Sequence, residues 1–185
     1  YRFLLTLQSL GYARRIEGDR WAITLRMFNV GSRALDHLDL HAVSRPVAEE
    51  LAEELGETVH MGGLEGDSAV YILKIESKYT IRMFSRVGRR IPLYCTAIGK
   101  VLLAFSGEEE RRASLEDVKL VAHTPKTISR RAALDAELRK VKSRGCAVDD
   151  EEHEEGIVCI GAPVFDREGN LVAALSASWP RFRYE

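Results

Sequence analysis

The sequence predicts an α+β fold in which helices pack on an antiparallel sheet, and two observations carry that prediction. Residues 58–75 and 156–178 each read as a β-hairpin, with a polar turn between two apolar strands. Between them, residues 96–105, 108–115 and 129–144 have the composition and apolar spacing of helices. Strands that pair as hairpins, with helices inserted between the hairpins, are typical of α+β domains on an antiparallel sheet.

The chain opens with a helical pattern followed by a short basic hairpin. Apolar residues recur at helical spacing over residues 3–10, and Gly11 ends the pattern. Residues 12–16 and 21–25 predict two strands joined by the polar turn 17–20. The first residues already read as a helix, without an initiating Met, so we expect further sequence upstream.

A helix followed by a basic hairpin has the shape of the end of a winged helix-turn-helix. In such a domain the helix enters the major groove, and arginines of the hairpin contact phosphates. The candidate DNA-binding residues are Arg2, Arg14, Arg15 and Arg20. The alternative is a helix and hairpin that only pack on the core.

The middle of the chain predicts helices and then strands. Residues 26–40 suggest a connecting helix, and an amphipathic stripe continues to Leu55, with Pro46 either kinking the helix or opening its first turn. Gly56 ends this helix. A hairpin follows, and we expect a third short strand at residues 81–85.

The second half predicts three helices and a closing hairpin. Thr96 is the expected N-cap of the helix that runs to Phe105, and Gly145 is expected to close the helix 129–144. Residues 156–165 and 171–178 form the closing hairpin around a polar turn.

Composition excludes several classes of protein. With 45% hydrophobic and 30% charged residues in 185, the chain is neither disordered nor fibrous. The formal net charge of -1 excludes a protein that coats nucleic acid by overall charge, but the charges are segregated. Residues 1–35 carry six arginines against two carboxylates, residues 74–100 carry seven cations against one carboxylate, and residues 149–155 carry six carboxylates. A locally basic face therefore remains possible.

Neither a membrane segment nor a disulfide framework is expected. The longest strongly apolar stretch, near residues 171–179, is far shorter than the ~20 residues of a membrane span. The three cysteines, Cys95, Cys146 and Cys159, are odd in number and contain no C-x-x-C pair. This pattern favours a reducing cytoplasm over disulfides or a zinc ribbon.

Residues 86–100 are the most informative stretch. A loop set by Pro92 leads small residues into a helix N-terminus, where free N–H groups and the helix dipole favour an anion such as a carboxylate. The small Ala97 and Gly99 would let a ligand approach the backbone closely. The alternative is a plain capped helix that packs Ala97 and Val101 inward.

The acidic run 149–155 leads into the apolar strand 156–165. Carboxylates this dense cannot all be buried, so most must face solvent. One of the first two, Asp149 or Asp150, is a candidate to turn inward and accept hydrogen bonds from ligand hydroxyls.

Small and polar residues alternate on the closing hairpin. Ser176 and Ser178 lie two apart, hence on one face of their strand, and Ile157 and Cys159 are paired in the same way on the preceding strand. Together they predict a pocket floor with hydroxyl groups. The alternative is small residues that fill a tight core.

Catalysis and metal binding have weaker support. Cys159 and His153 are a conceivable nucleophile and base, but nothing in the sequence brings them together. The set Asp149, His153 and Cys159 matches no strong metal-ligand spacing. We therefore expect a protein that is not an enzyme, with no metal or other cofactor assigned, and a metal in the region of Asp149 and Cys159 stays an open alternative.

Three motifs, in this order, resemble the IclR family of bacterial transcriptional regulators, and the match spans nearly the whole chain. They are residues 88–100 (GRRIPLYCTAIGK), residues 149–164 (DDEEHEEGIVCIGAPV) and residues 176–178 (SAS). The stretches 70–75 and 83–90 look most similar to the subgroup that represses 2-keto-3-deoxygluconate and pectin-derived sugar-acid catabolism.

This resemblance implies a domain order. Residues 1–25 would be the end of a winged helix-turn-helix whose remainder is absent, residues 26–40 a linker helix, and residues 41–185 a GAF/profilin-like effector-binding domain. It also implies double-stranded operator DNA and a small organic acid, here a 2-keto sugar acid, as partners, in a cytoplasmic homodimer or homotetramer. Carried over by motif, the effector-binding residues are Tyr79, Met83, Ile91, Ala97, Ile98, Asp149, Ile157, Cys159, Ser176 and Ser178.

The resemblance also implies a mechanism. Backbone N–H groups of residues 97–99 and two serines would hold the effector carboxylate, and the linker helix would relay effector binding to the DNA-binding heads. Relatives that bind two- and three-carbon acids commonly carry a Gly-Ala pair where this chain has Ala97-Ile98, so we expect a pocket of different shape. The alternative function is a metabolite-sensing GAF-like module with a non-transcriptional output, and an enzyme acting on a keto acid comes third.

Overall fold

The structure, a computed structural model, describes residues 1–18, 20–36 and 39–183, and gives the backbone alone for residues 31–36 and 39. Contacts divide the chain into two compact units, Tyr1–Ser44 and Arg45–Glu185. Each unit is described by itself below.

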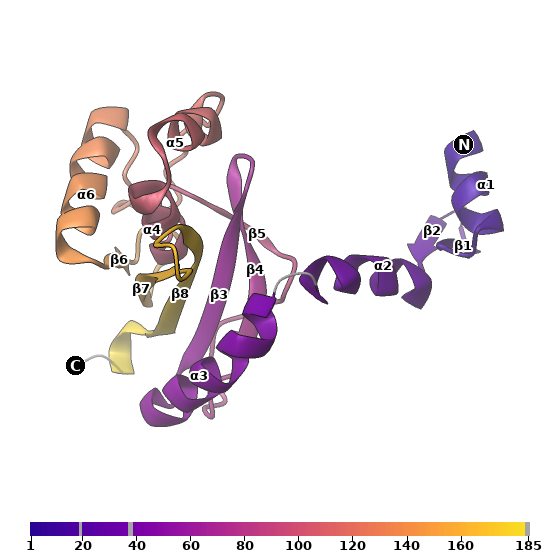
Figure 1. Cartoon of the computed structure of the whole chain (residues 1–185), viewed down its shortest axis with the longest axis horizontal. Helices are drawn as coiled ribbons and strands as arrows, with labels where there is room; N and C mark the ends of the chain where they lie inside the picture. The colour runs from indigo at the N-terminus through magenta and orange to yellow at the C-terminus, as the bar shows by residue number, and fades with distance from the viewer. Residues whose placement is uncertain (19, 37–38, 184–185) are drawn as a thin grey trace. The chain divides into compact units, whose positions relative to one another are not determined.

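The first unit contains the predicted helix and hairpin (Figure 1). Its elements are α1 (Arg2–Ser9), β1 (Ala13–Ile16), β2 (Arg20–Ile23) and α2 (Leu25–Asp36). Gly11 has a φ of 75°, a left-handed conformation that ends α1 and turns the chain toward β1. The two strands pair antiparallel, with Ala13 opposite Ile23. Asp19, in the predicted turn, lies outside the described residues.

The predicted connecting helix is divided between two elements. α2 ends at Asp36, residues 37–38 lie outside the described residues, and α3 spans Asp39–Leu55. Pro46 lies inside α3, neither in its first turn nor at its end. Gly56, with a φ of 72°, ends α3 as expected, and its N–H donates to the carbonyl of Ala52.

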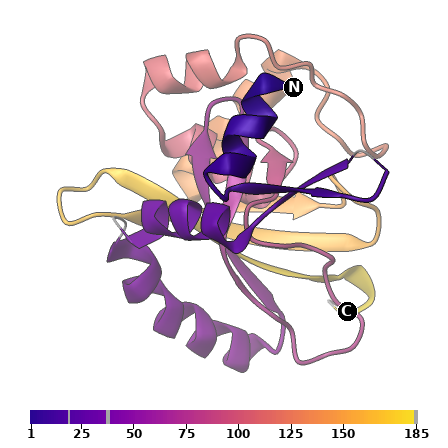
Figure 2. The ribbon, with the colours of Figure 1, turned by 90° about the vertical axis from the view of Figure 1, so that its right-hand side faces the viewer.

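A six-stranded sheet forms the centre of the second unit (Figure 2). Its strands are β3 (Thr58–Glu65), β4 (Ser68–Ile75), β5 (Arg90–Pro92), β6 (Ala147–Asp150), β7 (Ile157–Phe165) and β8 (Leu171–Pro180). Their order is β5-β4-β3-β8-β7-β6, and every pair is antiparallel. The two predicted hairpins are therefore joined through β3 and β8, so that the last strand of the chain lies beside the first strand of the sheet.

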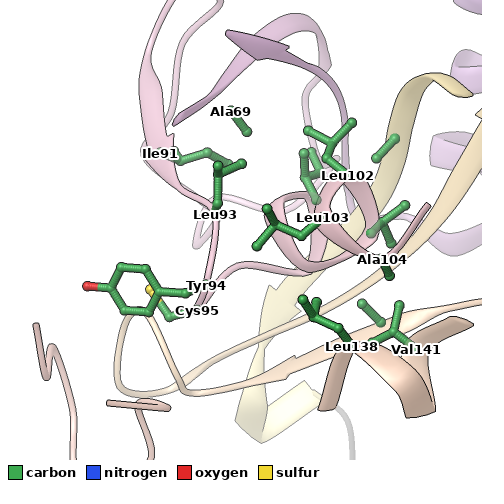
Figure 3. Close-up of a cluster of buried hydrophobic side chains, with 14 of the residues drawn as sticks. Ala69, Ile91, Leu93, Tyr94, Cys95, Leu102, Leu103, Ala104, Leu138 and Val141 are labelled. Carbon is green, nitrogen blue, oxygen red and sulfur yellow. The ribbon is translucent and has the colours of Figure 1, made fainter. Parts of the chain in front are cut away.

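Most of α3 belongs to this α+β unit, and three further helices complete it. They are α4 (Ala97–Phe105), α5 (Glu108–Leu115) and α6 (Arg131–Arg144), and Arg181–Arg183 form a single 3-10 turn. α4 is almost wholly buried between the sheet and α6. Figure 3 shows Leu102 and Leu103 of α4 in one apolar cluster with Leu138 and Val141 of α6. Burying each such side chain contributes about 1.5–3 kcal/mol, so α4 is fixed firmly in the unit.

One predicted strand is absent, and one strand was not predicted. Residues 81–85 form a loop, in which the carbonyls of Met83 and Ser85 accept hydrogen bonds from the Lys74 ammonium and not from a neighbouring strand. The edge strand forms instead at β5, where Ile91 lies opposite Ala69. β6 escaped prediction because it has only four residues, the last two of which belong to the acidic run.

Two further findings concern the chain as a whole. In the described part of the chain, no helix combines the length and the apolar character that a membrane crossing requires. All three cysteines are free thiols, with Cys95 and Cys159 buried.

Candidate functional site

A small cavity lies between the N-terminus of α4 and the closing hairpin. Its volume is about 20 Å³, close to the space of a single water molecule. The residues that line it are Tyr71, Met83, Ile91, Thr96, Ala97, Ile98, Asp149, His153, Glu154, Ile157, Cys159, Ser176 and Ser178.

Nine of the ten effector-binding residues expected from the sequence line this one cavity. They come from the loop before β5, from β5 itself, from α4 and from β6, β7 and β8. The exception is Tyr79, which is 42% exposed and does not line the cavity. Its ring lies under the guanidinium of Arg183, with 4.6 Å between the guanidinium carbon and the ring centroid.

The N-terminus of α4 borders the cavity through Thr96, Ala97 and Ile98. Thr96 is the N-cap, and its hydroxyl oxygen accepts the N–H of Gly99 at 3.1 Å while the hydroxyl donates to the Pro92 carbonyl at 2.6 Å. The first N–H groups of a helix have no partner within the helix. The N–H groups of residues 97–99 were expected to bind the effector carboxylate. Because Gly99 already donates to Thr96, only the N–H groups of Ala97 and Ile98 remain for that role.

Gly99 has a packing role and not the expected role of admitting a ligand. A Cβ at this position would lie 2.4 Å from the Cα and the carbonyl oxygen of Leu93. The glycine therefore allows the loop before α4 to cross the helix closely.

Two carboxylates of the acidic run face inward: Asp149, which is 4% exposed, and Glu152, which is paired with the buried Lys100. One of the Asp149 carboxylate oxygens accepts the backbone N–H groups of Glu152, at 2.8 Å, and of His153, at 3.4 Å. Burial raises the pKa of Asp149 to about 7, against the lowering effect of these hydrogen bonds. By contrast, Asp150 is half-buried and pairs with Lys126 and Arg181.

Strand register places the small residues of the cavity floor side by side. Cys159 lies opposite both Asp149 on β6 and Ser178 on β8, and Gly161 lies opposite Ser176. The two serine residues and Cys159 are buried on the face of the sheet that α4 covers. The cavity therefore has a floor of small and polar side chains, as expected from residue spacing.

This geometry does not support Cys159 as a nucleophile. Burial raises the pKa of its thiol to about 12, and the nearby Asp149 acts in the same direction, so the thiolate is disfavoured at neutral pH. The imidazole Nδ1 of His153 lies 3.8 Å from the sulfur of Cys95 instead.

Ile98 occupies part of the space above this floor. It is 2% exposed and lines the cavity, at the second position of the Ala97-Ile98 pair. A Cβ on Gly62 of β3 would lie 2.8 Å from Cγ2 of Ile98. Gly62 thus makes room for the bulk of Ile98, a relationship between two distant segments that spacing along the chain does not reveal.

Four lining residues were not among the expected effector-binding set: Tyr71, Thr96, His153 and Glu154. Thr96 was assigned only its capping role, and His153 was considered only for catalysis or metal binding. Tyr71 is buried on β4 and stacks on His60, with ring centroids 4.4 Å apart. An apolar strand position gives little sign that a tyrosine ring borders a cavity.

The four candidate DNA-binding arginines lie on the first unit. Arg2 is on α1, Arg14 and Arg15 are on β1, and Arg20 is on β2. All four side chains are exposed, and the guanidinium of Arg20 donates to the Glu17 carbonyl at 3.2 Å.

Comparisons with known proteins agree with this architecture. Residues 32–185 match the family model described as bacterial transcriptional regulator IclR C-terminal. Over its full length the chain is 46% identical to the HTH-type transcriptional regulator KdgR of Escherichia coli (strain K12) and spans 70% of it. It is 45% identical to KdgR of Dickeya chrysanthemi and spans 61% of that protein. These relatives are transcriptional regulators and not enzymes.

Two solved structures show the same fold. The crystal structure of the Thermotoga maritima IclR is 36% identical, with a TM-score of 0.82, and the alignment covers 100% of this chain and 75% of that one. The C-terminal domain of Escherichia coli KdgR is 44% identical, with a TM-score of 0.72, covering 80% of this chain and 85% of that one.

Proposed function

Because this chain belongs to the IclR family of bacterial transcriptional regulators, we propose that its cavity binds a small organic-acid effector that controls operator binding. The identity to KdgR over the whole chain favours a cytoplasmic repressor of sugar-acid catabolism. The effector would then be a 2-keto sugar acid of the 2-keto-3-deoxygluconate type. The observation that carries the proposal is that nine residues chosen from the sequence surround one cavity.

The cavity offers a separate partner for each end of such a ligand. At the start of α4, the N–H groups of Ala97 and Ile98 and the helix dipole favour a carboxylate. On the floor, the hydroxyls of Ser176 and Ser178 can donate to keto or carboxylate oxygens. Asp149 would accept hydrogen bonds from ligand hydroxyls.

Binding requires the cavity to open. Its volume of about 20 Å³ holds roughly one water molecule, far less than a six-carbon acid needs. Four wall residues lie outside the strands and helices, namely Met83, Thr96, His153 and Glu154. Of these, Met83 has an unbranched apolar side chain that repacks easily. The ligand therefore favours an arrangement of the walls that differs from the one seen here. A difference in affinity between two arrangements is what allows an effector to shift operator binding.

The remaining parts of the proposal concern the first unit and assembly. Residues 1–25 would be the end of a winged helix-turn-helix, in which Arg2, Arg14, Arg15 and Arg20 contact DNA phosphates. Residues 26–40 would link it to an effector-binding domain at 41–185. The protein would act as a homodimer or homotetramer, which matches operators of two-fold symmetry.

Thermal unfolding of the 185-residue chain with a panel of acids tests this function. The panel contains 2-keto-3-deoxygluconate, glyoxylate, pyruvate and an aromatic acid. A ligand at one hundred times its dissociation constant adds about 2.7 kcal/mol to the free energy of unfolding. We expect the midpoint to rise selectively with 2-keto-3-deoxygluconate.

Variants locate the binding site. Ser176→Ala and Asp149→Asn are expected to reduce the shift, whereas Ser143→Ala, an exposed serine on α6, leaves it unchanged. If both cavity variants keep the full shift, the ligand binds elsewhere. If no acid in the panel raises the midpoint, the assigned effector class is wrong.

A further inference from the structure

The polar row on the floor of the cavity continues onto the neighbouring strand, β3. Strand order places β3 beside β8, and the register sets Thr58 opposite Ser178 and His60 opposite Ser176. Directly opposed residues of an antiparallel pair point to the same face of the sheet. Thr58 and His60 therefore lie on the face that carries the two floor serines, although neither lines the cavity in this arrangement.

α4 covers this same face of β3. A Cβ on Gly62 would lie 2.8 Å from Cγ2 of Ile98, near the start of α4. Pairing of β3 with β8 is regular from Thr58 to Gly62, and side chains alternate along a strand, so Thr58, His60 and Gly62 share the covered face. The row on β3 is thus continuous with the part of the sheet on which we propose that the effector binds.

Two polar atoms of this row are buried without a partner. Thr58 and His60 have no solvent exposure, and among the described residues the Thr58 hydroxyl and Nδ1 of His60 find no hydrogen-bond partner. Most buried polar atoms in folded proteins are hydrogen-bonded, because leaving one unpaired lowers stability. A ligand that reached β3 would supply the missing hydrogen bonds.

The chemistry of the two atoms selects a hydroxyl group as their partner. Burial lowers the pKa of His60 to about 3, so its ring is neutral at pH 7 and Nδ1 carries either a proton or a lone pair. The Thr58 hydroxyl can donate or accept. A ligand hydroxyl also does both, so it can pair with either atom in either tautomer of the ring. Neither atom bears a charge that would favour a carboxylate.

The cover over His60 is the loop that contributes Met83 to the cavity. Nε2 of His60 lies 2.6 Å from the Ser85 hydroxyl. Lys74, opposite His60 on β4, donates to the carbonyls of Met83 at 3.3 Å and of Ser85 at 2.9 Å. Displacement of this loop would therefore enlarge the cavity in the direction of β3, which is the room that a six-carbon acid lacks in this arrangement.

We propose that Thr58 and His60 form a second compartment of the effector site, which binds the hydroxyl-bearing chain of a 2-keto sugar acid. The inference rests on the effector function proposed above and adds the residues that distinguish a sugar acid from a short keto acid. Neighbouring strands lie about 4.8 Å apart, so a six-carbon chain seated over β8 reaches β3. Buried hydrogen-bonding groups discriminate against an analogue without the matching hydroxyls, because they then stay unpaired.

Titration calorimetry of the 185-residue chain with 2-keto-3-deoxygluconate and with pyruvate tests the compartment. Pyruvate reproduces the keto-acid end of the larger ligand and lacks its hydroxyls. Thr58→Val keeps the branched shape and removes the hydroxyl, and His60→Gln places an amide near Nε2 and removes Nδ1. Each should weaken binding of 2-keto-3-deoxygluconate at least fivefold and that of pyruvate less than twofold. Ser114→Ala, which removes a buried hydroxyl on α5 outside the cavity lining, should change neither.

Urea titration without ligand separates this binding role from a structural one. Thr58→Val should keep the wild-type midpoint or exceed it, because the ligand-free chain has no hydrogen bond there to lose. Unchanged affinity for 2-keto-3-deoxygluconate in both variants, or equal losses for both acids, would overturn the compartment. The effector site itself stands in that case if Ser176→Ala still weakens binding. If the wild-type chain binds neither acid, the effector assignment and its extension fail together.

Discussion

Lys100 and Glu152 form an ion pair between the middle of α4 and the turn after β6, and the Lys100 side chain has no solvent exposure. The same ammonium donates to the Val148 carbonyl at 2.5 Å. This buried cation fastens the helix that presents Ala97 and Ile98 to the segment that carries Asp149. The ion pair therefore fixes the positions of two walls of the cavity relative to each other.

Removing one partner of this pair should be costly. Lys100→Met leaves a largely buried carboxylate without its cation, and we expect the free energy of unfolding to fall by about 3 kcal/mol. Urea titration measures the loss. The double variant Lys100→Met with Glu152→Gln should lose less than the two single losses together, by at least about 1 kcal/mol. Strictly additive losses would show that the pair contributes no coupling.

The close crossing at Gly99 gives a second prediction. Gly99→Ala would place a methyl group 2.4 Å from backbone atoms of Leu93, which cannot rotate away. We expect a loss of about 3 kcal/mol or more from overpacking. Gly63→Ala is the control, because open space surrounds that position on β3 and its loss should stay within about 0.5 kcal/mol. Similar urea midpoints for the two variants would contradict this account of Gly99.

Much of the fold could be predicted because its signals are local. The two hairpins, the Thr96 cap and the glycine stops at Gly56 and Gly145 follow from residues adjacent in sequence, and the structure contains all of them. The false strand at residues 81–85 had suitable residues but no neighbouring strand to pair with. Pairing is a tertiary property, and here the Lys74 side chain satisfies the loop carbonyls instead.

Some features of the cavity could likewise be predicted from local spacing, whereas others depend on how distant segments fold together. Ser176 and Ser178 share a face of β8 because side chains alternate along a strand, and spacing reveals this directly. That Cys159 of β7 lies on the same face follows from strand register, which places it opposite Ser178. The fit of Gly62 to Ile98, and the register that places Thr58 and His60 beside the two serines, depend on segments that meet only after folding. No pattern within one segment could have predicted either.

His60 predicts a pH dependence of stability. It is fully buried on β3, stacks on Tyr71, and its Nε2 lies 2.6 Å from the Ser85 hydroxyl. Burial, assisted by the nearby Lys74 ammonium and opposed by Glu76, lowers the pKa of His60 from 6.5 to about 3. Between these values the unfolded chain binds a proton that the folded chain does not. The share of the free energy of unfolding that depends on neutral His60 is therefore fully present above about pH 6.5. It is lost as the pH falls toward 3.

The size of this effect is measurable. From pH 7 to pH 5.5, His60 should lower the free energy of unfolding by about 1 kcal/mol. Urea titrations of the wild-type chain and of His60→Gln at both pH values isolate this share, since the other titrating groups are common to the two proteins. An equal pH dependence in both would mean that His60 binds its proton over the same pH range in the folded and the unfolded chain.

Tyr79 and Met83 lie in the same loop, and their different positions predict different effects on effector binding. Met83 lines the cavity, so Met83→Ala should weaken binding of 2-keto-3-deoxygluconate at least fivefold, the equivalent of about 1 kcal/mol. Tyr79 instead packs under Arg183, whose guanidinium is paired with Glu57. Tyr79→Ala should therefore cost about 0.5–1 kcal/mol of stability and change affinity less than twofold.

Titration calorimetry with 2-keto-3-deoxygluconate distinguishes these two positions, and urea titration reports the stability of each variant. Arg183→Lys serves as the control, because it disturbs the same stacked contact without touching the cavity. A large loss of affinity in Tyr79→Ala, with none in Arg183→Lys, would mean that the loop folds inward around the ligand and brings Tyr79 into contact with it. The residue set implied by the family motif would then hold for the bound protein, and the exposed position of Tyr79 would belong to the ligand-free arrangement alone.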